Sequence, residues 1–351
     1  MKRVDVDLPG WTGEAVHVFE DSLTGALAAI AIHQRVEGRS AGGTRMKVYS
    51  EPGHAIEDAQ RLAEGMTFKW AAAGLELGGA KAAIHVPPDL GVEARRNLLE
   101  RYGECVRDLE GAFSTGPDLG TSSEDMDIVA EVAPGLALGR TVDAGGAGDP
   151  APYTALGVLE AMRVVLQFLD GEPVFADAGV IIQGVGNVGA QLAAKLQAEG
   201  AKVRVSDIDA NVVDACRVMG IDSVPMEAVY ETECDIFAPC ATGGILRRRN
   251  ISAMRCRAVA GAANTQLRDP ADAERLKDRR IAYAPDFIIN CGGAIAITRM
   301  ELDGWDAERA RAATIETVRE NLTQVLEAAA LSDRSPQALA LELVEERIAN
   351  R

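Results

Sequence analysis

The sequence predicts an α/β protein made of two domains with a cleft between them. The chain has 351 residues, whereas one domain commonly holds about 100–200. After residue 150, strand and helix patterns alternate, which is typical of a parallel sheet with helices on both faces. The Gly- and Pro-rich segment 143–152 is the best linker candidate, so we expect one domain at 1–146 and another at 147–330. The C-terminal helix, at about 331–351, is expected to return to the first domain.

The first half of the chain predicts a hairpin followed by alternating helices and strands. Residues 15–35 contain two apolar strands around the turn SLTG, and AGGTRM at 41–46 breaks this pattern with two glycines. Residues 53–73 have the apolar spacing of a helix, and 74–88 are a glycine-rich turn that leads into a short strand. A helix is expected at about 91–110.

The next segments predict a loop, a helix and then the alternating elements of the second domain. TGPDLGTSSEDMDIVAEV, which starts at Thr115, begins as a loop and ends as a helix, with Thr121, Ser122 and Ser123 as N-cap candidates. A helix is expected at about 154–169. Strands are expected at 179–183, 202–206, 235–238, 257–260 and 286–289. The charged tail from about 305 to 350 forms two helices separated at 331–336.

Composition excludes several classes of protein. Hydrophobic residues make up 47% of the chain, too many for a disordered protein. Lys and Arg number 36 against 53 Asp and Glu, and the net charge of −17 argues against binding nucleic acid. The sequence has no apolar run long enough for a transmembrane helix and its N-terminus does not resemble a secretory signal, so a cytoplasmic location is expected, with no membrane partner. The six cysteines form no C-x-x-C pair, so we expect buried thiols and no metal site.

The sharpest local pattern lies in VIIQGVGNVGAQLAAKLQAEGAKVRVSDID, which starts at Val180. An apolar strand runs into a G-x-G-x-x-G turn that opens a helix, and a second strand ends at an acidic residue. Gly184 permits the tight turn, Gly186 lets the backbone approach a pyrophosphate, and Gly189 lets helix and strand pack closely. Such a motif alone can be a plain glycine turn, but here every part of a dinucleotide-binding (Rossmann) unit follows in order. The carboxylate of Asp207 would bind the ribose hydroxyls and, with Asp209, repel a 2′-phosphate, which favours NAD over NADP.

Two lysines of the first half lie in unusual surroundings. Lys69 lies in GMTFKWAAAG, an almost wholly apolar helical stretch, and Lys81 lies where the turn LGGAK meets an apolar strand. Burying an ammonium group without a partner is costly, so a functional role is one interpretation. The alternative is that both side chains reach solvent from the edge of their helix or strand.

Seven segments in the same order carry a resemblance to a known family. They are AGGTRM (41–46), EGMTFKWAAAGLELGGAK (64–81), TGPDLGTSSEDMD (115–127), GVGNVG (184–189), APCATGGIL (238–246), AGAANTQL (260–267) and YAPDFIINCGGAI (283–295). Over nearly the whole chain, the sequence resembles the Glu/Leu/Phe/Val amino-acid dehydrogenases, and among them the leucine and phenylalanine dehydrogenase branch. The resemblance implies NAD-dependent oxidative deamination of an L-amino acid to a 2-oxo acid and ammonia, and the reverse reductive amination.

The resemblance also implies roles for single residues in the substrate site. Lys69 would pair with the substrate carboxylate, and Lys81 would activate the hydrolytic water. Asp118 would move protons on and off the substrate nitrogen, while Gly43 would present its backbone to the substrate. From the residues alone, Asp118 and the nearby Asp125 and Asp127 are equal candidates for the acid/base group, since Asp is common both in turns and in the first turn of a helix.

On the cofactor side, the resemblance implies further contacts. Thr154 would bind the nicotinamide carboxamide, Asn264 would lie near the substrate amino group and the nicotinamide, and Asn290 would close the pocket from the cofactor side. The remaining expected cofactor contacts are Asn187, Val188, Ile208, Cys240, Ala241 and Ala262. The N-terminal domain is expected to carry the contacts of a homo-oligomer, because the family assembles through it.

The expected side-chain pocket is apolar. Its candidate residues are Ala41, Trp70, Gly116, Ala294 and Ile297, which offer no second cation for a glutamate substrate. Small residues favour a bulky side chain such as that of phenylalanine or tryptophan, whereas GDPAPYTALGV (148–158) is closer to the leucine branch and Trp70 can refill the space. Ala80 stands where the family usually has a third glycine, which adds a methyl group beside Lys81.

Two other functions remain as alternatives. A dehydrogenase of a related amine or a 2-hydroxy acid would share the nucleotide site, but a hydroxy-acid enzyme normally uses a histidine base, and none of the four histidines lies in a matching glycine-rich loop. A catalytically silent NAD-binding protein would have no need for Lys69, Lys81 and Asp118 together.

Overall fold

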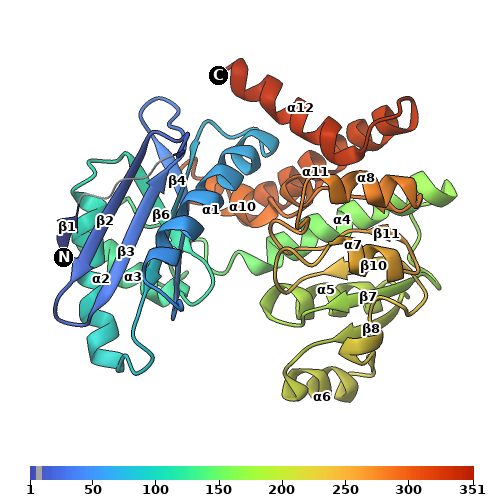
Figure 1. Ribbon diagram of the computed structural model, residues 1–351, viewed down its shortest axis with the longest axis horizontal. Coiled ribbons are helices and arrows are strands. Elements are labelled where there is room, and N and C mark those ends of the chain that lie inside the picture. Colours follow the sequence, from blue (N-terminus) through green and yellow to red (C-terminus); the bar gives the residue numbers. More distant parts are fainter. Residues whose placement is uncertain (5–9) are drawn as a thin grey trace. The chain divides into compact units, whose positions relative to one another are not determined.

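The computed structural model describes residues 1–4 and 10–351 (Figure 1). Contacts divide the chain into two compact units, and each is described by itself. The first unit consists of Met1–Pro150, Ile297–Asp306 and Ile348–Arg351, and the second of Ala151–Ala296 and Ala307–Arg347. The division after Pro150 falls within the Gly- and Pro-rich segment that suggested a linker.

The first unit is built on a mixed sheet with the strand order β1-β2-β3-β5-β4-β6. The strands are β1 (Lys2–Val4), β2 (Ala15–Asp21), β3 (Ala26–Ile32), β4 (Ser40–Lys47), β5 (Gly78–His85) and β6 (Phe113–Pro117). β2 and β3 pair antiparallel, which confirms the predicted hairpin, and β5 pairs antiparallel to β3. β4 pairs parallel to both β5 and β6. The carboxyl ends of these three strands therefore lie at the same end of the sheet.

The expectation that AGGTRM interrupts regular structure is wrong, because this segment forms most of β4. A Cβ added to Gly42 would lie 1.7 Å from the carbonyl oxygen of Ala80 on β5. The missing side chain therefore permits the close approach of the two backbones. Glycine is uncommon inside strands, but here it allows β4 and β5 to pair.

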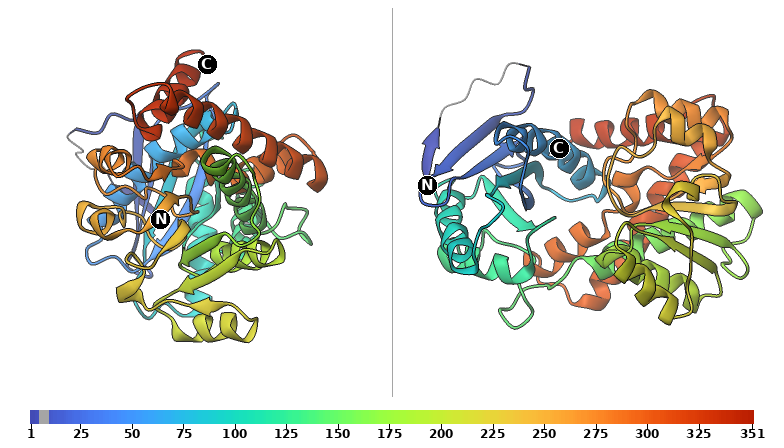
Figure 2. Two further views of the ribbon diagram at one scale, coloured as in Figure 1. Left: turned by 90° about the vertical axis from the view of Figure 1, so that its right-hand side faces the viewer. Right: turned by 60° about the horizontal axis from the view of Figure 1, so that its bottom comes forward.

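Helices cover both faces of this sheet (Figures 1 and 2). They are α1 (Gly53–Ala72), α2 (Val92–Arg107) and α3 (Ser123–Val132). The predicted helices at 53–73 and 91–110 are confirmed, and Ser122 caps α3 in a capping box with Asp125. Ala55, Ala59 and Ala63 of α1 pack with Ala83 of β5 on one face. On the other face, α2 and α3 bury a core that includes Ala80, Ala82 and Ile84 of β5.

Side chains alternate along β5, so Lys81 shares a face with Ala83 and with α1. The methyl group of Ala80 points into the opposite core and is fully buried there. The departure from glycine at this position therefore fills the core rather than the surroundings of the Lys81 ammonium group.

The second unit contains a parallel sheet with the order β12-β11-β10-β7-β8-β9, as the alternating pattern predicts. Its strands are β7 (Gly179–Gln183), β8 (Lys202–Ser206), β9 (Asp222–Ser223), β10 (Cys234–Pro239), β11 (Cys256–Val259) and β12 (Ala282–Tyr283). Two of the predicted strands match exactly, and two others match to within a residue at either end.

The predicted strand at 286–289 is wrong, because these residues form the short helix α9 (Asp286–Ile289). All four are buried, and a short apolar run that is buried on every side has the same pattern as a helix turn or as a strand. The strand of this region is the shorter β12, which precedes Pro285.

Except for the helix at 292–301, which is divided between the two units after Ala296, the remaining helices belong wholly or mostly to the second unit. They are α4 (Ala151–Asp170), α5 (Asn187–Ala198), α6 (Ala210–Val218), the 3₁₀-helix η1 (Met226–Ala228), α7 (Arg248–Ala253), α8 (Ala271–Asp278), α10 (Gly292–Glu301), α11 (Ala307–Ala330) and α12 (Pro336–Ala349). In the described part of the chain, no helix is long and apolar enough to cross a membrane.

The two predicted C-terminal helices are α11 and α12, but the grouping of α12 differs from the expectation. Residues up to Arg347 group with the second unit, and only Ile348–Arg351 group with the first. α12 is held to α11 by a hydrogen bond of 2.7 Å from the Arg347 guanidinium to the Asn321 side-chain oxygen. The last residue reaches the first unit, where the Arg351 guanidinium donates to the Leu75 carbonyl at 2.7 Å.

Candidate active site

Lys81, Asp118 and Gly43 meet where β5, β6 and β4 lie side by side. The Lys81 side chain is 8% exposed, and its ammonium group forms an ion pair with the Asp118 carboxylate. A Cβ on Gly43 would lie 2.9 Å from the Cβ of Asp118 and 3.2 Å from the Nζ of Lys81. The strand pairing therefore brings together three of the residues that the sequence singled out, and a glycine leaves the space between the two charges.

The turn after β6 fixes the backbone of Asp118. The Thr121 hydroxyl accepts a hydrogen bond of 2.9 Å from the Asp118 N–H and donates one of 2.8 Å to the Thr44 carbonyl on β4. The Leu119 N–H donates to Oδ1 of Asp118 at 2.6 Å. Burial alone would raise the pKa of Asp118, but the charges of Lys81 and Arg45 outweigh it and hold the pKa well below its usual range.

The two other acidic candidates are engaged in structural contacts. Asp125 completes the capping box of α3 and forms an ion pair of 2.5 Å with Arg95. Asp127 accepts hydrogen bonds from the Thr141 N–H at 3.0 Å and from its hydroxyl at 2.6 Å. Of the three aspartates that were equal by residue type, Asp118 alone has an ion pair with Lys81 among the contacts of the described residues.

Lys69 lies near the end of α1, half-buried, on a helix that packs closely on β5. A Cβ on Gly79 would lie 2.2 Å from the Thr67 backbone nitrogen and 2.5 Å from the Ala63 carbonyl oxygen. This glycine therefore lets the turn of α1 that precedes Lys69 rest directly on the strand that carries Lys81.

The expected pocket residues fall in different places. The Trp70 indole N–H donates a hydrogen bond of 2.8 Å to the Ala41 carbonyl, and both residues are buried. A Cβ on Gly116 would have its nearest contact, the Leu138 carbonyl oxygen, at 3.5 Å. Ala294 and Ile297 both lie on α10 and are half-buried.

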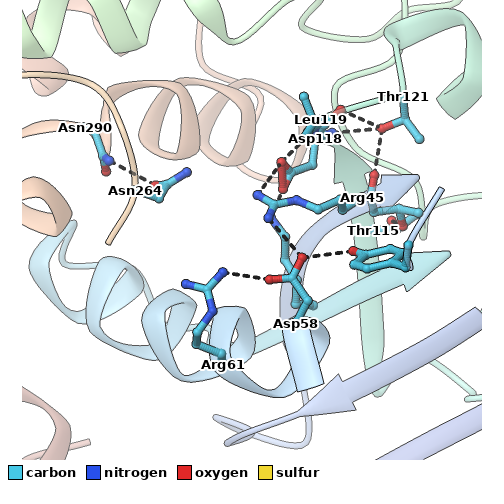
Figure 3. Close-up of polar contacts among 12 residues, drawn as sticks. Arg45, Asp58, Arg61, Thr115, Asp118, Leu119, Thr121, Asn264 and Asn290 are labelled. Carbon is cyan, nitrogen blue, oxygen red and sulfur yellow. Dashed lines mark hydrogen bonds and ion pairs between the residues drawn. The ribbon is translucent and has the colours of Figure 1, made fainter. Parts of the chain in front are cut away.

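A group of charges that was not predicted from the sequence lies behind Asp118 (Figure 3). Arg45 lies two positions after Gly43 on β4, and its guanidinium is 3.4 Å from Oδ1 of Asp118 and 3.1 Å from Oδ2 of Asp58 on α1. Asp58 also accepts a hydrogen bond of 2.9 Å from the Tyr49 hydroxyl and pairs with Arg61 at 2.7 Å. The signal for Arg45 was its spacing from Gly43, because residues two apart on a strand share a face.

In the second unit, the glycine turn has the form of a phosphate cradle. A Cβ on Gly189 would lie 2.0 Å from the Gly184 carbonyl oxygen, and Gly184 itself has φ +99°. A Cβ on Gly186 would have no atom of the described residues within 4 Å. The first and third glycines are therefore required by packing, whereas the second faces the open space in which a dinucleotide pyrophosphate would lie at the N-terminus of α5.

Asp207, at the end of β8, is fixed beside this turn. Its carboxylate accepts hydrogen bonds from the Val185 N–H at 2.7 Å and from the Asp209 N–H at 3.0 Å. Ile208 is 90% exposed next to it, and an exposed apolar side chain of this kind can cover an adenine ring. The exposed Asn187 and the half-buried Val188 form the first turn of α5.

Other expected cofactor contacts gather at the carboxyl edge of the parallel sheet. Cys240 and Ala241 follow β10, and a Cβ on Gly184 would lie 2.6 Å from the Cβ of Ala241. The Asn290 amide donates to the Ala262 carbonyl at 3.1 Å and to the Asn264 side-chain oxygen at 3.0 Å. Among the described residues, no group donates a hydrogen bond to the buried side-chain oxygen of Asn290, so this oxygen has free acceptor capacity.

Thr154 lies in the first turn of α4, half-buried. The same turn contacts the segment after Asn290, because a Cβ on Gly292 would lie 2.2 Å from the Tyr153 carbonyl oxygen. The second unit therefore brings the turn that carries Thr154 and the Asn264–Asn290 pair toward one edge of its sheet. Together with the phosphate cradle, these residues fit a dinucleotide.

The cysteines are free thiols, four of them buried and two half-buried. Burial raises the pKa of Cys240 to about 12, so this residue remains an uncharged thiol beside the glycine turn at neutral pH. Within residues 1–4 and 10–351, no three His, Cys, Asp or Glu side chains gather as metal ligands would.

Comparisons with known proteins agree with this arrangement. The family model described as the dimerisation domain of Glu/Leu/Phe/Val dehydrogenases matches residues 16–133, and the Glutamate/Leucine/Phenylalanine/Valine dehydrogenase model matches 145–223 and 216–350. A leucine dehydrogenase of Geobacillus stearothermophilus is 39% identical over 337 residues, which cover 95% of this chain and 90% of that protein. A phenylalanine dehydrogenase of Lysinibacillus sphaericus is 37% identical over 91% of this chain and 84% of its own length.

A solved structure extends the comparison to the fold. The crystal structure of L-tryptophan dehydrogenase from Nostoc punctiforme aligns with a TM-score of 0.77 and 31% sequence identity, and the alignment covers 97% of both chains. With both family models matched in order and nearly the full length covered, the chain belongs to the Glu/Leu/Phe/Val family of amino-acid dehydrogenases.

Proposed function

We propose that the protein catalyses the NAD-dependent oxidative deamination of an apolar L-amino acid, bulky aliphatic or aromatic, and the reverse reductive amination of its 2-oxo acid. The observation that carries the proposal is the buried ion pair between Lys81 and Asp118, closely packed against the backbone of Gly43. An acid/base carboxylate and a lysine in contact are the groups that removal of an amino nitrogen requires.

In this proposal the residues of the first unit handle the substrate and its protons. Lys69 binds the substrate carboxylate, and Asp118, ionised in the free enzyme because its pKa is lowered, accepts a proton from the substrate ammonium group. A nicotinamide cofactor held by the second unit would supply the hydride acceptor for the substrate Cα. Lys81, as the free amine, then takes a proton from the water that attacks the imine carbon. Asp118 returns its proton to the carbinolamine nitrogen and, ionised again, accepts the hydroxyl proton as the C–N bond breaks, the carbonyl forms and ammonia leaves.

NAD rather than NADP is proposed because of Asp207. The Val185 and Asp209 N–H groups hold its carboxylate at the end of β8, where it can accept hydrogen bonds from the ribose hydroxyls and repel a 2′-phosphate. Gly184, Gly186 and Gly189 hold the pyrophosphate. We assign to the cofactor the residues of the sheet edge as well: Thr154, Asn187, Val188, Ile208, Cys240, Ala241, Ala262, Asn264 and Asn290.

The apolar substrate is proposed from the character of the expected pocket. Ala41, Gly116, Ala294 and Ile297 carry no charge, and the relatives compared above are named for leucine, phenylalanine and tryptophan. The N-terminal region matches a domain described as a dimerisation domain, which supports a homo-oligomer that forms through it. A cytoplasmic location completes the proposal.

The test is NADH oxidation with ammonia and a panel of 2-oxo acids, from pyruvate through 4-methyl-2-oxopentanoate to phenylpyruvate and indolepyruvate. NADPH and omission of ammonia serve as controls. Ammonia-dependent turnover that is fastest on a branched or aromatic acid supports the proposal. Turnover without ammonia would indicate a hydroxy-acid dehydrogenase, and NADH binding without turnover on any acid would indicate a silent member of the family. Lys81→Ala should abolish turnover and leave NADH binding intact.

A further inference from the structure

Arg45 lies behind the Lys81–Asp118 pair and bridges two carboxylates. Its side chain is 13% exposed, and it leaves β4 on the face that also carries Gly43. One Nη atom is 3.1 Å from Asp58 and the other is 3.4 Å from Asp118. A single guanidinium therefore connects α1 to the turn that carries the proposed acid/base group (Figure 3).

Asp58 is held in place on its other side. The Tyr49 hydroxyl donates to Oδ2 of Asp58 at 2.9 Å, and the more exposed Arg61 pairs with Oδ1 at 2.7 Å. Burial would raise the pKa of Asp58, but Arg45 and the hydrogen bonds around it keep the pKa below the usual value. Asp58 therefore stays ionised at neutral pH and anchors the Arg45 guanidinium.

The two carboxylate oxygens of Asp118 have different partners. Oδ1 faces the Leu119 N–H and Arg45, whereas Oδ2 faces the ammonium group of Lys81. Rotation of the carboxylate would exchange the two oxygens, and the fixed guanidinium opposes this rotation. Oδ2 is thereby left as the oxygen that exchanges protons.

The orientation of Arg45 favours this role over a purely structural one. Among the residues that the structure describes, Nε of Arg45 is buried without a hydrogen-bond partner. The guanidinium therefore directs its two Nη atoms to carboxylates while one donor stays unsatisfied. Asp58 already has Arg61 and Tyr49 as partners, so its carboxylate would be paired and hydrogen-bonded without Arg45. A buried ion pair by itself adds little stability.

We propose that Arg45, anchored by Asp58 and Tyr49, is a positioning residue that keeps the Asp118 carboxylate turned toward Lys81. The inference rests on the proposed function, since it concerns the acid/base group of that reaction. Arg45 itself exchanges no proton and touches neither substrate nor cofactor in this scheme.

The experiment compares Arg45→Lys and Arg45→Met with Arg101→Lys. The control alters a second, partly buried Arg–Asp pair of the same unit, in which Arg101 of α2 donates twice to Asp21 at the end of β2, each time at 2.8 Å. Measured are kcat, KM for the amino acid, the pH profile of kcat/KM and the melting temperature. We expect Arg45→Lys to lower kcat by about 10- to 100-fold with KM changed less than about threefold, because misplacement of a catalytic group affects the chemical step.

The pH profile separates positioning from simple loss of stability. Lys81 of β5 and Arg45 of β4 are the charged groups that face Asp118. Asp58 of α1 and Tyr49, which follows β4, lie behind Arg45. Arg45→Met removes a cation, so the pKa of Asp118 rises and the acidic limb of the profile moves to higher pH. Arg45→Lys keeps the charge and restores that limb without restoring kcat, and Arg101→Lys changes only the melting temperature.

Two further variants make every outcome decisive. Tyr49→Phe removes one anchor of Asp58 without changing any charge, and a folded variant should lose about 3- to 10-fold in kcat even if the Arg45 variants do not fold. Asp118→Asn tests the proposed function itself: if it keeps full turnover, the acid/base assignment fails. If Asp118→Asn is inactive while the Arg45 and Tyr49 variants keep kcat and pH profile like the Arg101 control, only the positioning role of Arg45 is refuted.

Discussion

A single methyl group placed on Gly43 should separate the charges of the proposed site. Its Cβ would lie 2.8 Å from the Pro117 carbonyl oxygen, 2.9 Å from the Cβ of Asp118 and 3.2 Å from Nζ of Lys81. Carbon contacts in a packed interior are about 3.5–4.0 Å, so the turn that carries Asp118 has to retreat by about 0.5–1 Å. A displacement of this size costs about 100-fold in rate, and the strain of overpacking lowers the free energy of unfolding by about 1–3 kcal/mol.

The assay for Gly43→Ala is kcat in both directions, with urea unfolding and an NADH fluorescence titration on the same sample. The NADH dissociation constant should not change, because the glycine turn that binds the dinucleotide in our proposal belongs to the other unit. Gly65→Ala is the control: its Cβ meets nothing within 4 Å in the interior of α1, so kcat should be unchanged and the free energy of unfolding should rise by about 0.5–1 kcal/mol. A Gly43→Ala enzyme with kcat within about threefold of the wild type would refute the requirement for close apposition of Asp118 and Lys81.

Three further substitutions have distinct expected outcomes. Gly186→Val should weaken NADH binding by about tenfold or more, because its side chain enters the open space beside the turn. The melting temperature should fall only slightly, since valine is a poorer N-cap of α5 than glycine; unchanged affinity in the titration would contradict the proposed phosphate site. Trp70→Phe removes the indole N–H donated to the Ala41 carbonyl and should cost about 1–3 kcal/mol in urea unfolding, and wild-type stability would show that water replaces the bond. Asp21→Asn should lower the free energy of unfolding at pH 7 and approach the wild type below about pH 4. Burial raises the pKa of Asp21, but Arg101 and the neighbouring Thr24 lower it overall, so the stabilising effect of the carboxylate is lost as pH falls through that lowered pKa. An equal loss of stability at pH 3 and pH 7 would contradict this reasoning.

The sequence predicted most of the regular elements because their patterns are local. The parallel strands β7 and β8 matched to the residue, and the capping residue of α3, Ser122, is one of the three candidates. The failures lie where distant segments decide the structure. Gly42 supports a strand only because Ala80 approaches it from β5, and 286–289 becomes a helix although its run of apolar residues fits a strand equally well.

The candidate site followed the same division. Residue types alone could not distinguish Asp118 from Asp125 and Asp127, and only the family resemblance favoured Asp118. The structure adds that Asp125 pairs with Arg95 and Asp127 bonds to Thr141, contacts with other segments of the chain that no local pattern shows.

The glycines of the first unit also determine how readily this enzyme could acquire a new substrate preference. At Gly42 and Gly79 any side chain would overlap a neighbouring backbone. Substitutions at these two positions would therefore disrupt the fold and could not be used to change the substrate. Gly116 has room for a methyl group at ordinary contact distance. Evolutionary change can therefore accumulate at the wall of the proposed pocket while the catalytic strands remain invariant, and a lineage could pass from one amino acid to another by single viable steps.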